Sequence, residues 1–154
     1  MIAVVQRIAE GAITADGVKT GACGQGLLIL LGVAREDTEA DVRLLCDKIA
    51  RLRIFEDENG RMNRSVIDVC GTVATVSNFT LLADYRRGNR PDLFGAAPPE
   101  VAFPLYDRFC ELLEAQVGRG IRGVFGADMQ IATALAGPVT VVLDSRVLKK
   151  ERNP

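Results

Sequence analysis

GLLILLGVA, at residues 26–34, is the longest uncharged apolar run of the chain. It is far shorter than the roughly 20 residues that a membrane-spanning helix needs. Apolar residues at consecutive positions are typical of a strand that is buried on both faces. We therefore expect this segment to be a central strand, and its neighbours in the sequence indicate what surrounds it.

The segments on either side of this run predict a strand, a hairpin and a helix. Residues 2–8 are rich in β-branched side chains, and Asp16-Gly17 separates two short alternating stretches, which favours a hairpin. Downstream, Thr38 and Asp41 have the spacing of a helix N-cap and its capping-box partner. The helix is expected to run to about Arg51, because its apolar residues recur with the helical period.

The rest of the chain predicts more strands and one more long helix. Strands are expected in four segments, at residues 52–63, 65–69, 72–83 and 129–145, the last in two halves around residues 136–138. Residues 84–99 read as a long loop, and a second helix begins near Pro98-Pro99. Since we find neither repeats nor βαβ alternation, the predicted class is α+β, with a mainly antiparallel, barrel-like sheet and two principal helices. We expect a single domain over residues 1–145, followed by a basic tail at 146–154.

Composition narrows the classes of function. The chain has 154 residues, 19 Lys and Arg against 20 Asp and Glu, and no histidine, so any nucleic-acid contact must come from a local basic patch. The four cysteines form no CxxC pair, which predicts no metal site. The GxGxxG match at residues 118–123 follows a helix rather than a strand, so we expect no dinucleotide cofactor. The N-terminal residues lack the features of a signal peptide, which predicts a cytoplasmic protein with reduced thiols.

Two polar segments are candidates for chemistry. Ser77 and Thr80 carry hydroxyls, but a neutral hydroxyl needs an adjacent base to become a nucleophile, and the chain has no histidine. Backbone N–H groups at Phe79 and Thr80 could still stabilise an oxyanion. The second segment is an arginine loop, residues 84–92, whose guanidinium groups and Tyr85 suit phosphates and unpaired bases; a purely solvated loop is the alternative. Its candidate phosphate-binding residues are Arg86, Arg87 and Arg90.

Several blocks together resemble a known family. They are AVVQR, GQGLLILLGV, KIARLRIFEDENGRMN, SNFTL, YRRGNRPD, AAPPE, FGADM and GPVTVVLDS, in this order over roughly residues 1–145. This arrangement is similar to the D-aminoacyl-tRNA deacylases, which are homodimers with active sites at the subunit interface. The resemblance implies hydrolysis of the ester that joins a D-amino acid, or glycine mischarged on alanine tRNA, to the 3′ end of tRNA. It implies no cofactor and neither a membrane nor DNA as partner.

The resemblance also implies site residues. Ser77, Asn78, Phe125 and Met129 would contact the substrate, while Phe79 and Thr80 would position it and stabilise the oxyanion through their backbone amides. The 2′-hydroxyl of the terminal ribose would assist the hydrolysis. Gly137 and Pro138 would be joined by a cis peptide bond and would enter the partner subunit's pocket, where they exclude L-amino acids. Arg7 and Thr140 would support this motif.

Two positions depart from the family pattern and leave alternatives open. Asn78 stands where Gln is usual and is one methylene shorter, and Leu135 stands where Asn is usual. One alternative is a relative of relaxed specificity, with a trans Gly-Pro bond, that acts on L-alanyl-tRNA. The other is a dimer that binds the tRNA end without turnover.

Overall fold

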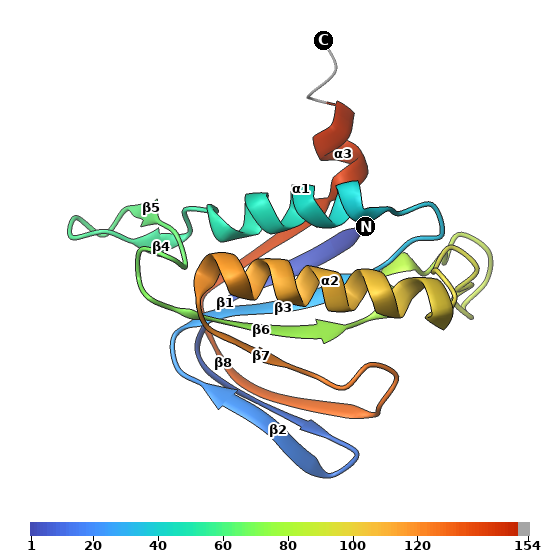
Figure 1. The fold of residues 1–154 in the computed structure, drawn as a ribbon, viewed down its shortest axis with the longest axis horizontal. Helices are drawn as coiled ribbons and strands as arrows, with labels where there is room; N and C mark the ends of the chain where they lie inside the picture. The colour runs from blue at the N-terminus through green and yellow to red at the C-terminus, as the bar shows by residue number, and fades with distance from the viewer. Residues whose placement is uncertain (151–154) are drawn as a thin grey trace.

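The computed structural model describes residues 1–150, and residues 151–154 of the predicted tail lie outside the described part. The apolar run forms a central strand of a six-stranded sheet, as expected. Figure 1 shows the arrangement of the elements. The strands of this sheet are β1 (Ile2–Ala15), β2 (Val18–Cys23), β3 (Gly26–Gly32), β6 (Thr72–Ser77), β7 (Gly120–Arg122) and β8 (Met129–Asp144).

The sheet is mixed rather than mainly antiparallel. Strand β1 pairs antiparallel with β2, β3 and β8, but β3 pairs parallel with β6, and β6 pairs parallel with β7. The two parallel pairs arise because the helices α1 (Glu39–Ala50) and α2 (Pro99–Val117) each return the chain to the same end of the sheet. The prediction that βαβ units are absent is therefore wrong. The barrel-like curvature is confirmed, since a Cβ atom on Gly21 of β2 would lie 3.0 Å from Ile121 of β7.

Three smaller elements differ from the predictions. A separate two-stranded sheet consists of β4 (Phe55–Glu56) and β5 (Met62–Arg64), and a third helix, α3 (Ser145–Lys150), covers the start of the predicted tail. Residues 65–69, predicted as a strand, form a turn in which the carboxylate of Asp68 accepts the Ser65 N–H at 2.7 Å. The Ser65 hydroxyl in return accepts the Asp68 N–H at 3.2 Å, and this reciprocal pair replaces the ladder hydrogen bonds of a strand.

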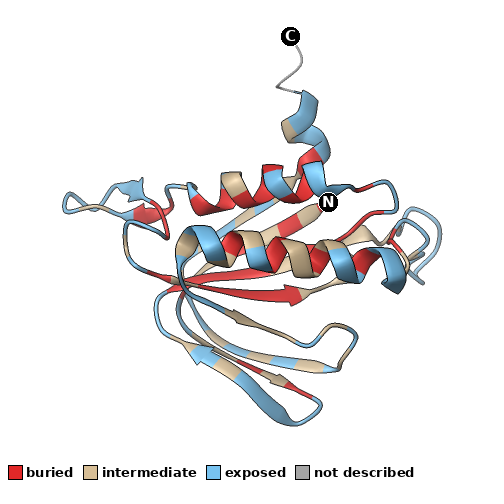
Figure 2. Ribbon diagram, in the orientation of Figure 1, coloured by how far each residue is buried: buried red, intermediate tan, exposed pale blue. Residues whose placement is uncertain are grey.

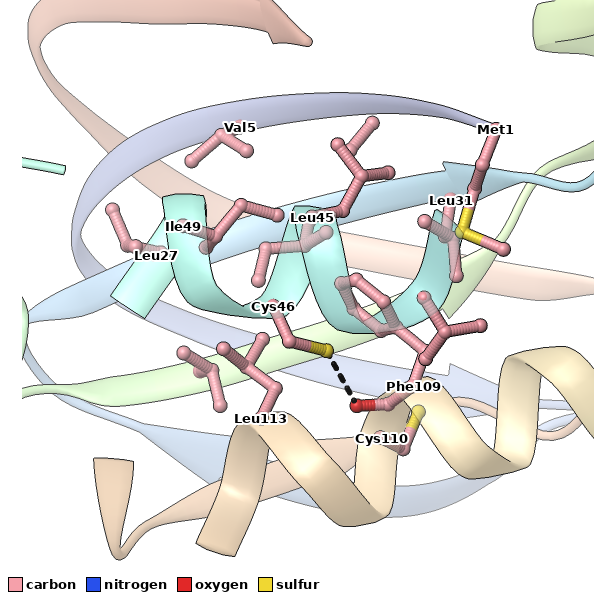
Figure 3. Packing of buried hydrophobic residues seen from close by; sticks show 14 of the residues in the cluster. Met1, Val5, Leu27, Leu31, Leu45, Cys46, Ile49, Phe109, Cys110 and Leu113 are labelled. Atoms are coloured by element: carbon pink, nitrogen blue, oxygen red, sulfur yellow. Dashed lines mark hydrogen bonds between the residues drawn. The ribbon is translucent and has the colours of Figure 1, made fainter. Parts of the chain in front are cut away.

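Both predicted helices are present, and their buried faces meet the sheet. Figure 2 shows buried residues on the inner sides of α1 and α2 and along β6. In the core, the Cys46 thiol donates a hydrogen bond to the Phe109 carbonyl at 3.5 Å (Figure 3). Burial raises the pKa of the Cys46 and Cys110 thiols to about 12, so both are neutral core residues, as predicted. In residues 1–150, every helix is either too short or too polar to cross a membrane.

The predicted capping residue Asp41 also joins the N-terminal half of α1 to α3. Its buried carboxylate accepts the Thr38 N–H at 2.9 Å and the Ser145 hydroxyl at 2.7 Å, and it lies 2.6 Å from the Lys149 ammonium group. Burial alone would raise the pKa of Asp41, but the hydrogen bonds from Lys149, Ser145 and Thr38 outweigh it and lower the pKa. The folded state therefore favours the charged carboxylate.

We expect Asp41→Asn to lower the free energy of unfolding at neutral pH by about 2 kcal/mol, because it removes the negative charge and one of the two acceptor oxygens that these donors use. Since the pKa of Asp41 is lowered on folding, its contribution is present above the ordinary aspartate pKa of about 3.9 and is lost as the pH falls below it. Urea unfolding of both proteins at several pH values measures this difference. Asp47→Asn on the same helix is the control, and a difference independent of pH would contradict the assignment.

Candidate active site

An open, mainly apolar pocket lies where β6 ends, α2 begins and the chain passes from β7 to β8. Its volume is about 220 Å³. Ser77 lines it from the end of β6 and Phe79 from the turn that follows, Pro99 from the first turn of α2, Phe125 from the β7–β8 connection and Met129 from the start of β8. These three parts of the chain lie on one side of the molecule in Figure 1. Four of the predicted substrate-contacting and positioning residues are thus brought together.

The apolar wall of the pocket is held by aromatic packing and by a close approach at Gly123. Phe125 meets Phe103 edge-on with ring centroids 5.3 Å apart and lies 5.7 Å from the ring of Tyr106. The buried Tyr106 hydroxyl donates to the Thr75 carbonyl of β6 at 3.0 Å, which links α2 to the strand below it. A Cβ atom at Gly123 would lie 2.3 Å from the Met129 sulfur, so the absence of a side chain there lets Met129 reach the pocket.

The hydroxyl of Thr80 is engaged by its neighbour. Thr80 Oγ1 donates a hydrogen bond to the side-chain oxygen of Asn78, an amide oxygen that is a very weak base. Strand β6 ends at Ser77, and residues Phe79–Leu82 form a 3₁₀ turn, η1, instead of continuing the predicted strand. In the described part of the chain, the N–H groups of Phe79 and Thr80 have no hydrogen-bond acceptor. The segment thus offers two free backbone donors beside the pocket but no base for a nucleophile.

The Gly-Pro segment, residues 136–138, lies elsewhere, in the middle of β8. The Gly137–Pro138 peptide bond is cis, as expected, and both residues are exposed. Arg7 donates from Nε to the Ala136 carbonyl at 3.2 Å and from a terminal nitrogen to the Ile54 carbonyl at 2.8 Å. Thr140, two residues beyond Pro138, accepts a long hydrogen bond of 3.4 Å from Gln6 of β1. Leu135, which precedes the segment, is 48% exposed.

Within one chain the Gly-Pro segment is remote from the pocket. Ser77 pairs with Leu31 of β3, and Leu31 pairs with Ala3 of β1. Ala3 in turn pairs with Leu143 of β8, and Pro138 precedes Leu143 on the same strand. Strand spacings of about 4.8 Å and a rise of about 3.3 Å per residue separate the two groups by roughly 20 Å. A single copy of the chain therefore does not bring its own Gly-Pro segment into its own pocket.

In the arginine loop, Arg86 is neutralised by a neighbour. Its guanidinium group forms an ion pair with Asp84, and hydrogen bonds from Arg86 lower the pKa of that carboxyl to about 2. Arg87 and Arg90 are exposed, and within residues 1–150 no carboxylate lies within ion-pair distance of either. The free positive charge of the loop therefore comes from Arg87 and Arg90 rather than from all three arginines.

Comparison with known proteins identifies the family. The D-Tyr-tRNA(Tyr) deacylase family matches residues 4–144 of the chain. The chain belongs to this family. It is 55% identical to the D-aminoacyl-tRNA deacylase of Anaeromyxobacter dehalogenans (strain 2CP-C), with 96% of this chain and 99% of the relative aligned. It is 51% identical to the D-aminoacyl-tRNA deacylase of Roseiflexus castenholzii (strain DSM 13941 / HLO8), with 99% and 98% aligned.

A solved structure of another protein has the same fold as this chain. It is named c-Myc DNA Unwinding Element Binding Protein and superimposes with a TM-score of 0.88 at 39% identity. The superposition covers 94% of this chain and 98% of the other. The mixed, nearly closed sheet is thus shared with an independently solved protein.

Four residues that line the pocket were not predicted from the sequence. Ala97 and Pro99 lie in the AAPPE block, and Gly126 and Ala127 lie in FGADM, so each belongs to a segment that carries the resemblance. The resemblance therefore pointed to these segments, but small side chains and proline carry no reactive group that would mark them as site residues. Their contribution to the pocket is the shape of the backbone.

Proposed function

We propose that this protein hydrolyses the ester bond of D-aminoacyl-tRNA, including glycine mischarged on alanine tRNA, to free tRNA and amino acid. The observation that supports this most directly is the pocket beside Phe79 and Thr80. It combines an apolar wall with two backbone N–H groups that have no acceptor in the described chain. Such donors suit an oxyanion that forms on the ester carbonyl. The names of the relatives, which are D-aminoacyl-tRNA deacylases, agree with this chemistry.

In the proposed mechanism the protein positions an ester that is already reactive. Water adds to the carbonyl carbon, the N–H groups of Phe79 and Thr80 bind the oxygen that becomes negative, and the ribose oxygen then leaves with a proton. The vicinal 2′-hydroxyl of the ribose moves the proton, since Thr80 donates its own to Asn78 and the chain contains no histidine. Ser77, Phe125 and Met129 hold the substrate from the pocket wall.

Selection against L-amino acids is proposed to require a second copy of the chain. The Gly-Pro segment is exposed and remote from its own pocket, so it would act in the pocket of the partner subunit. Strand β8 pairs with β1 along one edge only, and within residues 1–150 no strand pairs with its other edge. A long free edge with exposed apolar residues, here Leu135 and Val142, is a surface suited to a second copy.

The two departures from the family pattern have different consequences. Asn78 reaches the Thr80 hydroxyl, so its shorter side chain still holds η1 in the proposed positioning role. Leu135 supplies no polar group and lies exposed beside the Gly-Pro segment.

Hydrolysis of D-tyrosyl-tRNA, assayed beside L-tyrosyl-tRNA and L-alanyl-tRNA, tests the function. We expect release of amino acid from the D-form only. Hydrolysis of L-forms would favour the relaxed relative, and hydrolysis of none would favour a tRNA-end-binding protein.

A single-stranded DNA competitor belongs in the same assay, because the name of the solved structure described above refers to binding a DNA unwinding element. Inhibition by DNA as strong as that by uncharged tRNA would contradict selectivity for tRNA.

The arginine loop is proposed to contact phosphates of the acceptor end. Replacing Arg87 and Arg90 by glutamate should weaken tRNA binding and reduce the slope of log affinity against log salt by about one unit for each lost contact at most. Arg86→Ala is the matched control and should have a smaller effect, because Asp84 already neutralises Arg86. Filter-binding measurements over a salt series test both. An unchanged slope would support the alternative that the loop is only solvated and does not contact tRNA.

A further inference from the structure

Phe94 is a large apolar ring on the surface next to the arginine loop. It is 73% exposed, whereas most aromatic rings of this size are buried at least in part. Tyr85, within the arginine loop, is 79% exposed. Two solvent-exposed aromatic rings near free arginines add little to the stability of the fold, so we looked for a ligand that they could bind.

The ring of Phe94 is held in place from one side. The guanidinium carbon of Arg35 lies 4.3 Å from the ring centroid, and Nε of Arg35 donates a hydrogen bond to the Phe94 carbonyl. The Phe94 N–H donates to the Asp92 carboxylate at 2.8 Å, and Asp92 forms a β-bridge with Asp84 across the loop. Arg35 therefore covers one face of the ring, and the high exposure leaves the other face open to solvent.

The position of Phe94 relates it to the pocket. Ala97, which lines the pocket, follows Phe94 by three residues, so their Cα atoms are at most about 11 Å apart. Arg87 and Arg90 lie on the other side of Phe94 in the sequence, in the loop that the Asp84–Asp92 bridge closes. Within residues 1–150, no carboxylate lies within ion-pair distance of Arg35. In the sequence, the open ring thus lies between a residue that lines the pocket and two free arginines.

We infer that Phe94 and Arg35 form a stacking platform for an unpaired nucleobase in the 3′ strand of the RNA. This inference rests on the proposed function and adds a binding site to it. An unpaired base exposes a π-face that stacks on an aromatic ring, whatever the base. The guanidinium group beneath the ring strengthens the contact and attracts the neighbouring phosphate. The platform would hold the strand that leads from the pocket to the arginine loop.

The test measures the affinity for uncharged RNA, which does not depend on hydrolysis. Two minihelix RNAs are compared by fluorescence anisotropy, one with an unpaired 3′ overhang ending in CCA and one without it. Phe94→Ala should weaken binding of the overhang RNA roughly 5- to 100-fold and leave binding of the blunt RNA unchanged. Phe94→Tyr keeps the ring and should bind as the wild type does. Phe94→Leu keeps much of the apolar volume but lacks a ring, so it should resemble Phe94→Ala.

A matched control and two outcomes make the test decisive. Met62 of β5 is 57% exposed, so Met62→Ala removes a comparable exposed side chain and should change neither affinity. Equal affinity of wild type and Phe94→Ala for the overhang RNA would overturn the inference. So would an equal loss for both RNAs, since that indicates a disturbed loop rather than a lost base contact. Failure of the wild type to hydrolyse D-tyrosyl-tRNA would refute the proposed function, and the RNA affinities would still report on the platform.

Discussion

A D-aminoacyl-tRNA whose terminal ribose lacks the 2′-hydroxyl should be hydrolysed about 100-fold more slowly or worse, because the proposed proton-transfer group is then missing. Thr80→Ala, in contrast, should retain measurable activity. The physical reason is the environment of Thr80, whose hydroxyl donates to the amide oxygen of Asn78. An amide oxygen does not take up a proton at neutral pH, so Thr80 has no group that would activate it.

Single-turnover rates with the two substrates measure this difference, and the control is binding of the 2′-deoxy substrate. Its affinity should be close to that of the ribose form, so that the loss lies in the chemical step. Asn78→Ala adds a second comparison, because it frees the Thr80 hydroxyl. If that hydroxyl only positions η1, Asn78→Ala and Thr80→Ala should reduce the rate by similar factors. Isolation of an acyl-enzyme on Thr80 would refute the mechanism.

Gly137→Ala should reduce hydrolysis of D-substrates by roughly 5- to 150-fold while the protein stays folded. Gly137 has φ of 120°, a region that L-residues rarely adopt. An added Cβ atom would lie 2.9 Å from the Val139 backbone nitrogen and 3.1 Å from a terminal nitrogen of Arg7. The Gly-Pro segment must therefore shift. Gly17→Ala is the control, since Gly17 has φ of 80° in the hairpin turn and no atom within 4 Å of the added Cβ.

Mixing two impaired variants tests whether the Gly-Pro segment acts across subunits. Met129→Asp places a charge in the pocket, while Gly137→Ala leaves the pocket intact and alters the segment. If each site combines the pocket of one copy with the segment of the other, a mixed dimer contains one intact site. Random exchange should then restore roughly a quarter of the wild-type activity, as expected for a two-fold symmetric dimer. No recovery, with subunit exchange verified, would mean that each site uses the pocket and the segment of the same copy.

Features that depend on close neighbours in sequence were predictable. Leu27, Ile29 and Leu31 are buried, because consecutive apolar residues leave a strand no polar face to turn toward water. The Asp16-Gly17 hairpin and the helix start at Thr38 were also predicted correctly, since both depend on residues a few positions apart. Ser77, Phe79, Phe125 and Met129, which come from the family blocks, line one pocket.

Features that depend on contacts between distant segments required the tertiary structure. The parallel pairing of β3 with β6 follows from how α1 packs on the sheet, and the periodicity of either strand contains no information about that packing. The sequence places Arg86 with Arg87 and Arg90 as a candidate phosphate-binding residue, but its ion pair with Asp84 neutralises its charge. The sequence alone determined the central strand, the starts of the two long helices and the family. The tertiary structure decided which residues meet, because hydrogen bonds and packing between remote segments form only once the chain is folded.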